Sequence, residues 1–375
     1  MLFSCNSRAA AATNTKSRKS ITVKRNSKTL SIDLHCHIHT PPADDIAKQS
    51  ANNGTNPVSR YGNPRTEAQQ KKLHQDLHQK LTSIEQRIKD MDKMDIDVQA
   101  ISTSPLQYYY GVETDLGRKI ARTINERLVE ITASHPDRFA PLGTLPMQEP
   151  ELAVQELEYC MKELNFRGIE IGTNVNGVEI ADPRYEKMWA KCEELGAVVF
   201  LHPIGFTSPQ RLTQHFLTNV IGNPLDTTVA LAHIVFGGVL ERYPKLKIVA
   251  AHGGGFLGHY PARMDHAYKV RPECHDHITR PPSYYMKKIY YDTMVFGEPQ
   301  LEHLVNLYGA NHVVIGTDYP YDMGYYKPVN FVEKAKKLTR AQKDQIIGGT
   351  AAKLLGLKKR SNASRPKPTL RNSLR

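Results

Sequence analysis

The sequence contains few cysteines and no long apolar segment. Its five cysteines are widely separated and include no CxxC pair, so we predict no disulfide framework and expect a reducing compartment. No window approaches the ~18–20 apolar residues of a membrane-spanning helix, and residues 1–30 lack the apolar stretch of a secretory signal. We therefore expect a cytoplasmic protein with no membrane span.

Acidic residues are absent from both ends of the chain. Residues 1–30 and 358–375 contain fourteen lysines and arginines and no aspartate or glutamate. Subtracting these charges from the net charge of +12 leaves −2 for residues 31–357, which argues against a basic globular platform for nucleic acid. We predict two disordered basic tails that attract nucleic acid only nonspecifically. The Ser- and Ala-rich N-terminal tail also fits a mitochondrial transit segment, which is the alternative location.

Strand-like and helix-like segments alternate from residue 31 to residue 357. Eight short apolar segments have the composition of buried strands, and stretches with helical periodicity lie between them. This count predicts a single α/β domain folded as a (β/α)8 barrel of the TIM type, with an open doubly wound sheet as the alternative. The strand candidates are Ser31–Ile38, Ile96–Ser102, Phe139–Leu145, Gly168–Gly172, Ala197–His202, Ile248–His252, Ile289–Met294 and His312–Thr317.

Residues 41–70 interrupt this alternation. They are polar, rich in Pro, Asn and Gly, and show no periodicity. Structureless loops of this length are commonly functional lids or disordered segments. Because this segment directly follows the first strand, it would lie on the catalytic face of a barrel, and we interpret it as a lid.

The first strand candidate, SIDLHCHIHT, carries several histidines in alternation with apolar residues. Side chains alternate between the two faces of a strand. This places Ile32, Leu34, Cys36 and Ile38 on one face. It places Asp33, His35, His37 and His39 on the other. Because a barrel strand is covered on both sides, burying imidazoles there is costly unless they are hydrogen-bonded or bind a metal. The pattern favours a metal site over a surface strand with exposed histidines.

Three later strand candidates each end in a titratable side chain followed by Pro, Gly or Tyr-Pro. They are AVVFLHP with His202, KIVAAHGGG with His252, and HVVIGTDYP with Asp318. A polar residue at the C-terminal end of a barrel strand is typical of a catalytic site. Together with His35 and His37, these residues supply the nitrogen and oxygen ligands that zinc prefers, with manganese or iron as alternatives.

These motifs resemble those of the amidohydrolase superfamily. IDLHCHIHTPP, FLHP, GGVLERYPKLKIVAAHGGG and IGTDYPYDMG are similar to the aminocarboxymuconate-semialdehyde decarboxylase-like branch over about residues 31–357. The resemblance implies one divalent ion, most simply Zn²⁺, with His252 as the acid/base residue rather than a ligand and with Asp318 also able to move a proton. The implied metal ligands are His35, His37, His202 and Asp318.

The resemblance also implies a second copy of the chain. Arg263 matches a family arginine that reaches the carboxylate of a small-molecule substrate across a homodimer interface. Two features depart from the family. The place of an arginine in the lid is held by His74, with Arg60 and Arg65 further upstream, and His215 and Phe216 stand where the family uses another aromatic. The resemblance therefore supports the metal chemistry of this chain more strongly than it supports the identity of its substrate.

Two reactions suit the same residues. The first is a carbon–carbon lyase that decarboxylates an aromatic or muconate-semialdehyde-type acid, with the developing charge held by the metal. The second is a hydrolase in which metal-activated water attacks an amide, lactone or ester. Ligand spacing does not separate them, and the resemblance favours the decarboxylase.

Overall fold

The computed structural model describes residues 22–23, 29–52 and 63–359. A sheet of eight parallel strands forms its centre, in the order β11-β10-β9-β8-β5-β4-β3-β2. Bridges from Asp33 to Ile315 and from Cys36 to Tyr319 join its two ends. The strands are β2 Ile32–Ile38, β3 Val98–Thr103, β4 Phe139–Gly143, β5 Gly168–Ile171, β8 Val198–Leu201, β9 Lys247–Ala250, β10 Tyr290–Asp292 and β11 Val313–Val314. The predicted (β/α)8 barrel is confirmed, and the open sheet was the wrong alternative.

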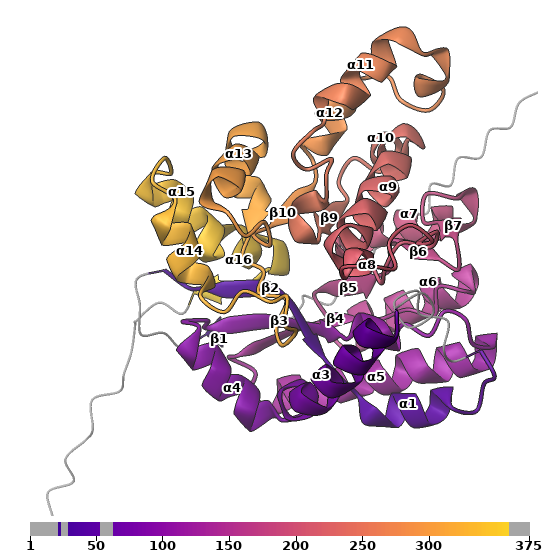
Figure 1. Ribbon diagram of the computed structural model, residues 1–375, viewed down its shortest axis with the longest axis vertical. Coiled ribbons are helices and arrows are strands. Elements are labelled where there is room, and N and C mark those ends of the chain that lie inside the picture. The colour runs from indigo at the N-terminus through magenta and orange to yellow at the C-terminus, as the bar shows by residue number, and fades with distance from the viewer. Residues whose placement is uncertain (1–21, 24–28, 53–62, 360–375) are drawn as a thin grey trace, which may run out of the picture.

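Helices surround the barrel and connect successive strands (Figure 1). Helix α5 illustrates their origin, because Ile120, Ile124, Leu128 and Ile131 recur at helical spacing and are all buried. The longer helices are α3 Pro64–Thr82, α4 Ile84–Lys93, α5 Thr114–Ser134, α6 Pro150–Glu158, α7 Glu186–Leu195, α9 Gly222–Phe236, α11 Ala262–Val270 and α13 Glu298–Tyr308. The shorter ones include α8 Leu217–Val220, α10 Val239–Arg242, α12 Pro282–Met286, α14 Pro328–Lys334, α15 Arg340–Asp344 and α16 Thr350–Leu355.

The apolar core has two parts, and strand β2 contributes to both. Ile32 and Leu34 pack inside the barrel with residues of other strands, such as Val98 on β3 and Phe200 on β8. Cys36 and Ile38 pack in the larger cluster between the strands and the helices. The predicted single apolar face of β2 is therefore wrong. A shift in strand pairing between Asp33 and Cys36 breaks the alternation, as a β-bulge does, so that apolar side chains and histidines share the interior.

The segment after β2 is more regular than its composition indicates. Helix α1 spans Pro41–Ala47 and helix α3 spans Pro64–Thr82. The prediction of a structureless loop over residues 41–70 is therefore wrong for the residues that lie in these two helices. Proline is accepted in the first turn of a helix, and Asn63 caps α3 by accepting a hydrogen bond from the backbone N–H of Thr66. Residues 53–62 lie outside the described part of the chain.

Two short segments of the predicted tails pair with each other. Strand β1, Thr22–Val23, is parallel to strand β12, Lys358–Lys359. The prediction of disorder was therefore wrong for these residues, where the β-branched Thr and Val favour an extended pairing. Residues 1–21, 24–28 and 360–375 lie outside the described part. Across the described helices, none is both long and apolar enough to cross a membrane.

A buried carboxyl group on α9 makes the stability of the fold depend on pH. Asp226 is buried and accepts hydrogen bonds from Thr173 and Asn174. Burial raises the pKa of Asp226 to about 7, although these hydrogen bonds oppose the shift. The folded state therefore holds this proton more tightly than the unfolded state. Stability should fall by up to about 1.4 kcal/mol per pH unit between the two pKa values, roughly pH 4 to 7, as the pH rises.

The Asp226→Asn variant should lose this dependence, because the amide does not ionise but can keep one or both hydrogen bonds. Urea unfolding of wild type and variant at pH 5 and pH 8 measures the effect. We expect the variant to gain stability relative to wild type at both pH values, and to gain clearly more at pH 8 than at pH 5, because wild type loses most of this stabilisation between the two. An equal difference at both pH values would contradict the assignment. Asp276→Asn, at an exposed loop position, is the matched control.

Candidate metal centre

Four side chains meet at one end of the barrel. His35 and His37 come from β2, His202 follows β8, and Asp318 follows β11. One ligand atom from each lies within 4.8 Å of the others, and all four residues are buried. The Nε2 atoms of His35 and His37 lie 3.4 and 3.3 Å from Asp318 Oδ1. The structure thus brings together the four residues that the sequence nominated as ligands.

The chemistry of this cluster fits a metal ion. His35 Nε2, His37 Nε2, Asp318 Oδ1 and both ring nitrogens of His202 are buried without a hydrogen-bond partner. Such atoms are costly in a folded protein unless something else satisfies them. Three imidazoles and one carboxylate form a donor set of the kind that binds zinc and related divalent ions.

The electrostatics of the cluster also favour a cation. Burial and the neighbouring histidines hold the pKa of His202 well below its usual range, so its ring is neutral with a free lone pair. Burial alone would raise the pKa of Asp318, but His35, His252 and His37 hold it well below its usual range. Burial would lower the pKa of His35, yet Asp318 and Asp292 raise it to about 10. Positive charge is stabilised here, as a proton or as a metal.

Asp292 orients His35. Its Oδ2 atom lies 2.6 Å from His35 Nδ1, which leaves Nε2 turned toward the cluster. The same carboxylate accepts hydrogen bonds from the backbone N–H groups of His252, Gly253 and Met294. A carboxylate behind a ligating histidine fixes the ring and raises its basicity. Asp292 therefore supports the metal cluster and the loop after β9 together.

His37 is held from a different side. Its Nδ1 atom lies 3.1 Å from the carbonyl oxygen of Thr103, and its own carbonyl oxygen accepts a hydrogen bond from buried Arg87. Glu170 Oε2 lies 3.8 Å from His37 Nδ1, and Glu170 Oε1 accepts a hydrogen bond of 2.5 Å from Tyr108. Burial raises the pKa of Glu170 despite the nearby His37. These contacts fix the direction in which His37 presents Nε2.

His252 borders the cluster without belonging to it. Its Nε2 atom lies 3.8 Å from Asp318 Oδ2, and its side chain retains 13% exposure. Both His252 and Asp318 have positive φ angles, 54° in each case. Residues other than glycine rarely adopt this conformation, which costs energy and recurs at active sites. The backbone is thus bent at both residues to aim their side chains at one place.

A cavity of about 320 Å³ opens beside His252 and Asp318. Its walls come from α8, the start of α9 and the loops that follow β9 and β10. Loops at the C-terminal ends of barrel strands are where TIM-barrel enzymes build their active sites. The cavity gives a small molecule access to the metal cluster.

Arg263 lies elsewhere in this chain. It is exposed on α11, which projects away from the barrel body together with α12 (Figure 1). Arg65, His215 and Phe216 line a second cavity of about 470 Å³ next to Asp322. Nothing is described of the side chain of His74. The structure therefore brings the four predicted ligands and His252 together and leaves Arg263 apart from them.

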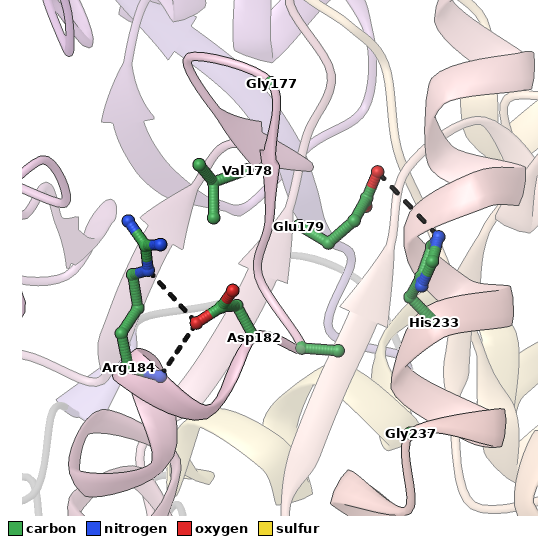
Figure 2. A pocket seen from close by; sticks show the side chains of 8 residues that line it. Gly177, Val178, Glu179, Asp182, Arg184, His233 and Gly237 are labelled. Carbon is green, nitrogen blue, oxygen red and sulfur yellow. Dashed lines mark hydrogen bonds and ion pairs between the residues drawn. The ribbon is translucent and has the colours of Figure 1, made fainter.

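A third cavity, of about 440 Å³, lies between the hairpin of β6 Asn174–Val175 and β7 Val178–Glu179 and helix α9 (Figure 2). Its charged side chains face one another in pairs. Glu179 Oε1 lies 3.9 Å from His233 Nε2, and Asp182 Oδ1 accepts a hydrogen bond of 3.0 Å from Arg184 Nε. Within the described residues, the four-residue cluster at the barrel end is the set whose spacing suits a metal.

A model of the amidohydrolase family matches residues 32–357. The chain belongs to this family. One relative is the 2-amino-3-carboxymuconate-6-semialdehyde decarboxylase of Dictyostelium discoideum, which is 33% identical over 333 residues that cover 88% of this chain and 92% of the relative. Another is the gamma-resorcylate decarboxylase of Rhodococcus jostii (strain RHA1), 27% identical over 63% of this chain and 77% of the relative. The resemblance drawn from the motifs is confirmed.

Solved structures of similar fold carry decarboxylase names. The 5-carboxyvanillate decarboxylase of Novosphingobium aromaticivorans, complexed with manganese and 4-hydroxy-3-methoxy-5-nitrobenzoic acid, has a TM-score of 0.78 at 20% identity, over 90% of this chain and 99% of that one. The 2,6-dihydroxybenzoate decarboxylase of Rhizobium has a TM-score of 0.71 at 22% identity, over 88% and 99%. At these identities the similarity establishes the fold of this amidohydrolase-family chain.

Sequence reasoning missed the supporting residues. Asp292 ends the segment IYYD, a largely apolar run that stops at a carboxylate as the run before Asp318 does, but the sequence left open which way it faces. Glu170 lies within GIEI, where a lone charged residue in a buried strand was the available signal. Asp33 was expected beside the histidines. It instead bonds to Gln99 and Thr317, because the shift in pairing along β2 turns it away from the cluster.

Proposed function

We propose that the protein is a metal-dependent carboxy-lyase that decarboxylates an aromatic or muconate-type carboxylic acid. The observation that carries this proposal is the buried cluster of three histidines and Asp318, whose metal-facing atoms have no other partner. The choice of decarboxylation over hydrolysis is supported by the relatives, whose names specify decarboxylases.

The proposed metal ligands are His35, His37, His202 and Asp318. Three nitrogen donors with one carboxylate suit Zn²⁺, and the manganese in a structural neighbour makes Mn²⁺ the second candidate. The ion would act as a Lewis acid that stabilises negative charge on a substrate oxygen. Asp292 and the Thr103 carbonyl would keep the rings of His35 and His37 oriented toward it.

His252 and Asp318 are proposed to handle the proton. Decarboxylation breaks the bond between the carboxyl carbon and its neighbour, and the electron pair of that bond stays on the neighbouring carbon. That carbon must therefore gain a proton. His252 lines the cavity, and its Nε2 atom is 3.8 Å from Asp318 Oδ2, so this pair can pass a proton to a substrate held in the cavity beside them.

Three further expectations concern the surroundings of the enzyme. Arg263 is exposed on a projecting helix, so it is proposed to reach the substrate carboxylate only from a second copy in a homodimer. A cytoplasmic location is supported by the described cysteines, Cys36, Cys160, Cys192 and Cys274, which are all free. Nonspecific binding of polyanions through the basic ends stays a prediction.

The proposal is tested by carbon dioxide release from protein loaded with Zn²⁺ or Mn²⁺. Hydroxybenzoates and a muconate semialdehyde should include at least one substrate that yields stoichiometric carbon dioxide and the protonated product. Chelation should abolish turnover, and readdition of the metal should restore it. Hydrolysis of lactones or amides, with no carbon dioxide released from any of the acids, would instead favour the hydrolase.

A further inference from the structure

We infer that Asp33 is a positioning residue, which sets the spacing of the metal ligands across the junction between β2 and β11, and that Gln99 and Arg87 hold its carboxylate in place. This inference rests on the proposed function, because it concerns the same metal site. It assigns a role to three buried side chains that are neither proposed ligands nor part of the cavity wall beside His252.

The proposed ligands lie on both sides of the junction between β2 and β11, at which the barrel closes. His35 and His37 belong to β2, whereas Asp318 follows β11. The two sides are joined through isolated bridges between single residues, and β11 ends at Val314, before Asp318 is reached. Regular strand pairing therefore does not by itself fix the distance between the two histidines and Asp318.

The carboxylate of Asp33 spans this junction. Its Oδ1 atom accepts hydrogen bonds of 3.1 Å from the backbone N–H groups of His35 and Thr317. Its Oδ2 atom accepts one of 2.7 Å from the hydroxyl group of Thr317. One buried carboxylate thus holds the backbone of a ligand on one side and the residue next to Asp318 on the other. Groups that fix the orientation of metal ligands from behind contribute to metal affinity.

Gln99 on β3 holds the same carboxylate from the neighbouring strand. Its Nε2 atom donates a hydrogen bond of 2.9 Å to Asp33 Oδ2, and its Oε1 atom accepts one of 3.0 Å from Arg87 Nη1. An ionised carboxylate only accepts hydrogen bonds and a guanidinium only donates them, so a single orientation of the Gln99 amide satisfies both. Arg87 and Asp33 are therefore coupled through Gln99.

Arg87 on α4 brings a buried positive charge to this network. Its fully buried guanidinium also donates to the carbonyl oxygen of His37, and its Cζ atom lies 4.8 Å from the ring centroid of Tyr319. These partners are neutral, and a buried cation is costly unless it is paired. Asp33, reached through Gln99, supplies the negative charge. The same guanidinium thus holds the second ligand of β2 and the Asp33 carboxylate.

The test measures metal affinity on the full-length protein, so that it does not depend on turnover. Wild type and Asp33→Asn are freed of metal with a chelator and titrated with Mn²⁺, and electron paramagnetic resonance follows the free ion. We expect Asp33→Asn to bind Mn²⁺ about 10–100-fold more weakly, which is the usual effect of losing a group that orients a ligand. The amide of the variant places a donor against Gln99 Nε2, and Arg87 prevents Gln99 from turning.

An Arg87→Met background tests the coupling. There Gln99 can turn and accept a hydrogen bond from the amide that Asp33→Asn introduces. We expect the loss of Mn²⁺ affinity caused by Asp33→Asn to be at least about threefold smaller in this background than in wild type, because residues in one hydrogen-bond network do not act additively. Equal losses in both backgrounds would overturn the role of Arg87.

Asp226→Asn is the matched control, since it makes the same substitution at a buried, hydrogen-bonded carboxylate outside this network. It should leave Mn²⁺ affinity within about twofold of wild type, as expected for independent sites. A loss equal to that of Asp33→Asn would overturn the positioning role. If Asp33→Asn did not fold, Thr317→Val would take its place, because it removes the hydroxyl donor and keeps the backbone N–H. It should weaken Mn²⁺ binding severalfold, and unchanged affinity would overturn the inference.

The outcomes separate this inference from the proposed function. If wild type bound no Mn²⁺, both would fail, since there would be no ion to position. If wild type bound Mn²⁺ and Asp33→Asn bound it equally well, the inference alone would fail. Weaker binding by Asp33→Asn, with no carbon dioxide released from any acid by wild type, would uphold the positioning role and refute the lyase.

Discussion

Removing any of the four clustered side chains should empty the metal site and nearly abolish turnover. In purified His35→Ala, His202→Ala and Asp318→Ala variants, we expect metal content to fall from about one ion per chain to near zero. Turnover should fall at least about 10³-fold, because a Lewis acid contributes several kcal/mol to the stabilisation of transition-state charge. Elemental analysis and carbon dioxide release measure the two effects on the same samples.

The three variants differ in what else they disturb. His35→Ala leaves Asp292 without the imidazole that lies 2.6 Å from its carboxylate, so it should also lower the thermal midpoint. Neither ring nitrogen of His202 has a hydrogen-bond partner in the described structure. His202→Ala therefore removes a ligand while breaking no side-chain hydrogen bond, and it should fold as well as wild type. It is the cleanest of the three tests.

A matched control comes from the same loop as Asp318. Asp322 is exposed four residues further along and lines the second cavity. Asp322→Ala should keep its metal. If wild type purified without chelators contained no divalent ion and bound none on addition, the metal mechanism would be refuted. If His202→Ala kept full occupancy, the ligand set would need revision.

The cluster could be predicted because each of its members carries a local signal. His35 and His37 are polar residues within an apolar strand, and His202 and Asp318 end apolar runs just before a turn. The barrel topology then guarantees that the C-terminal ends of parallel strands meet at one rim. The local sequence pattern around each ligand, combined with the barrel topology, was therefore enough to predict that the four side chains meet.

The supporting residues Asp292 and Glu170 each carried a local signal, but the sequence did not show which side chains they would contact. The pairing of Asp292 with His35 joins residues 257 positions apart, and its existence depends on the side-chain directions of β2 and β10, two strands with β11 between them. The pairing of β2 shifts between Asp33 and Cys36, and Asp33 bonds to Gln99 and Thr317. A strict two-residue alternation assumes a regular strand, so it placed Ile32 and Leu34 on the wrong side of the barrel.

Residues 41–70, the predicted lid, show where a prediction from composition fails. Composition alone suggested a loop, because prolines, glycines and asparagines make up a third of residues 41–70 and the segment shows no periodicity. Helix α1 nevertheless forms, since Pro41 and Pro42 occupy its first turn and Ala43 and Ala47 are buried. His39 and Asp44, whose Nε2 and Oδ2 atoms are 2.7 Å apart, tie the helix to the end of β2. Tertiary contacts of this kind override local propensity.

Replacing His252 should separate proton transfer from metal binding. We expect His252→Ala to retain about one metal ion per chain and to lose about 10²–10⁴-fold in turnover, which is the usual contribution of a positioned acid or base. The distinction follows from geometry. His252 lies outside the set of four whose ligand atoms are within 4.8 Å of one another, and it keeps contact with the cavity through which substrate enters.

Two comparisons make this prediction specific. His233→Ala removes an exposed imidazole at the third cavity and should leave both metal content and turnover unchanged. Binding of 2,6-dihydroxybenzoate to His252→Ala should stay within a few-fold of wild type if the histidine acts on the proton rather than on affinity. Loss of metal in His252→Ala, to the extent seen in His202→Ala, would make His252 a ligand. The proton would then have to come from Asp318 or from a group outside the described residues. Because the backbone N–H of His252 bonds to Asp292, which in turn orients His35, the alanine variant keeps this connection and isolates the contribution of the imidazole.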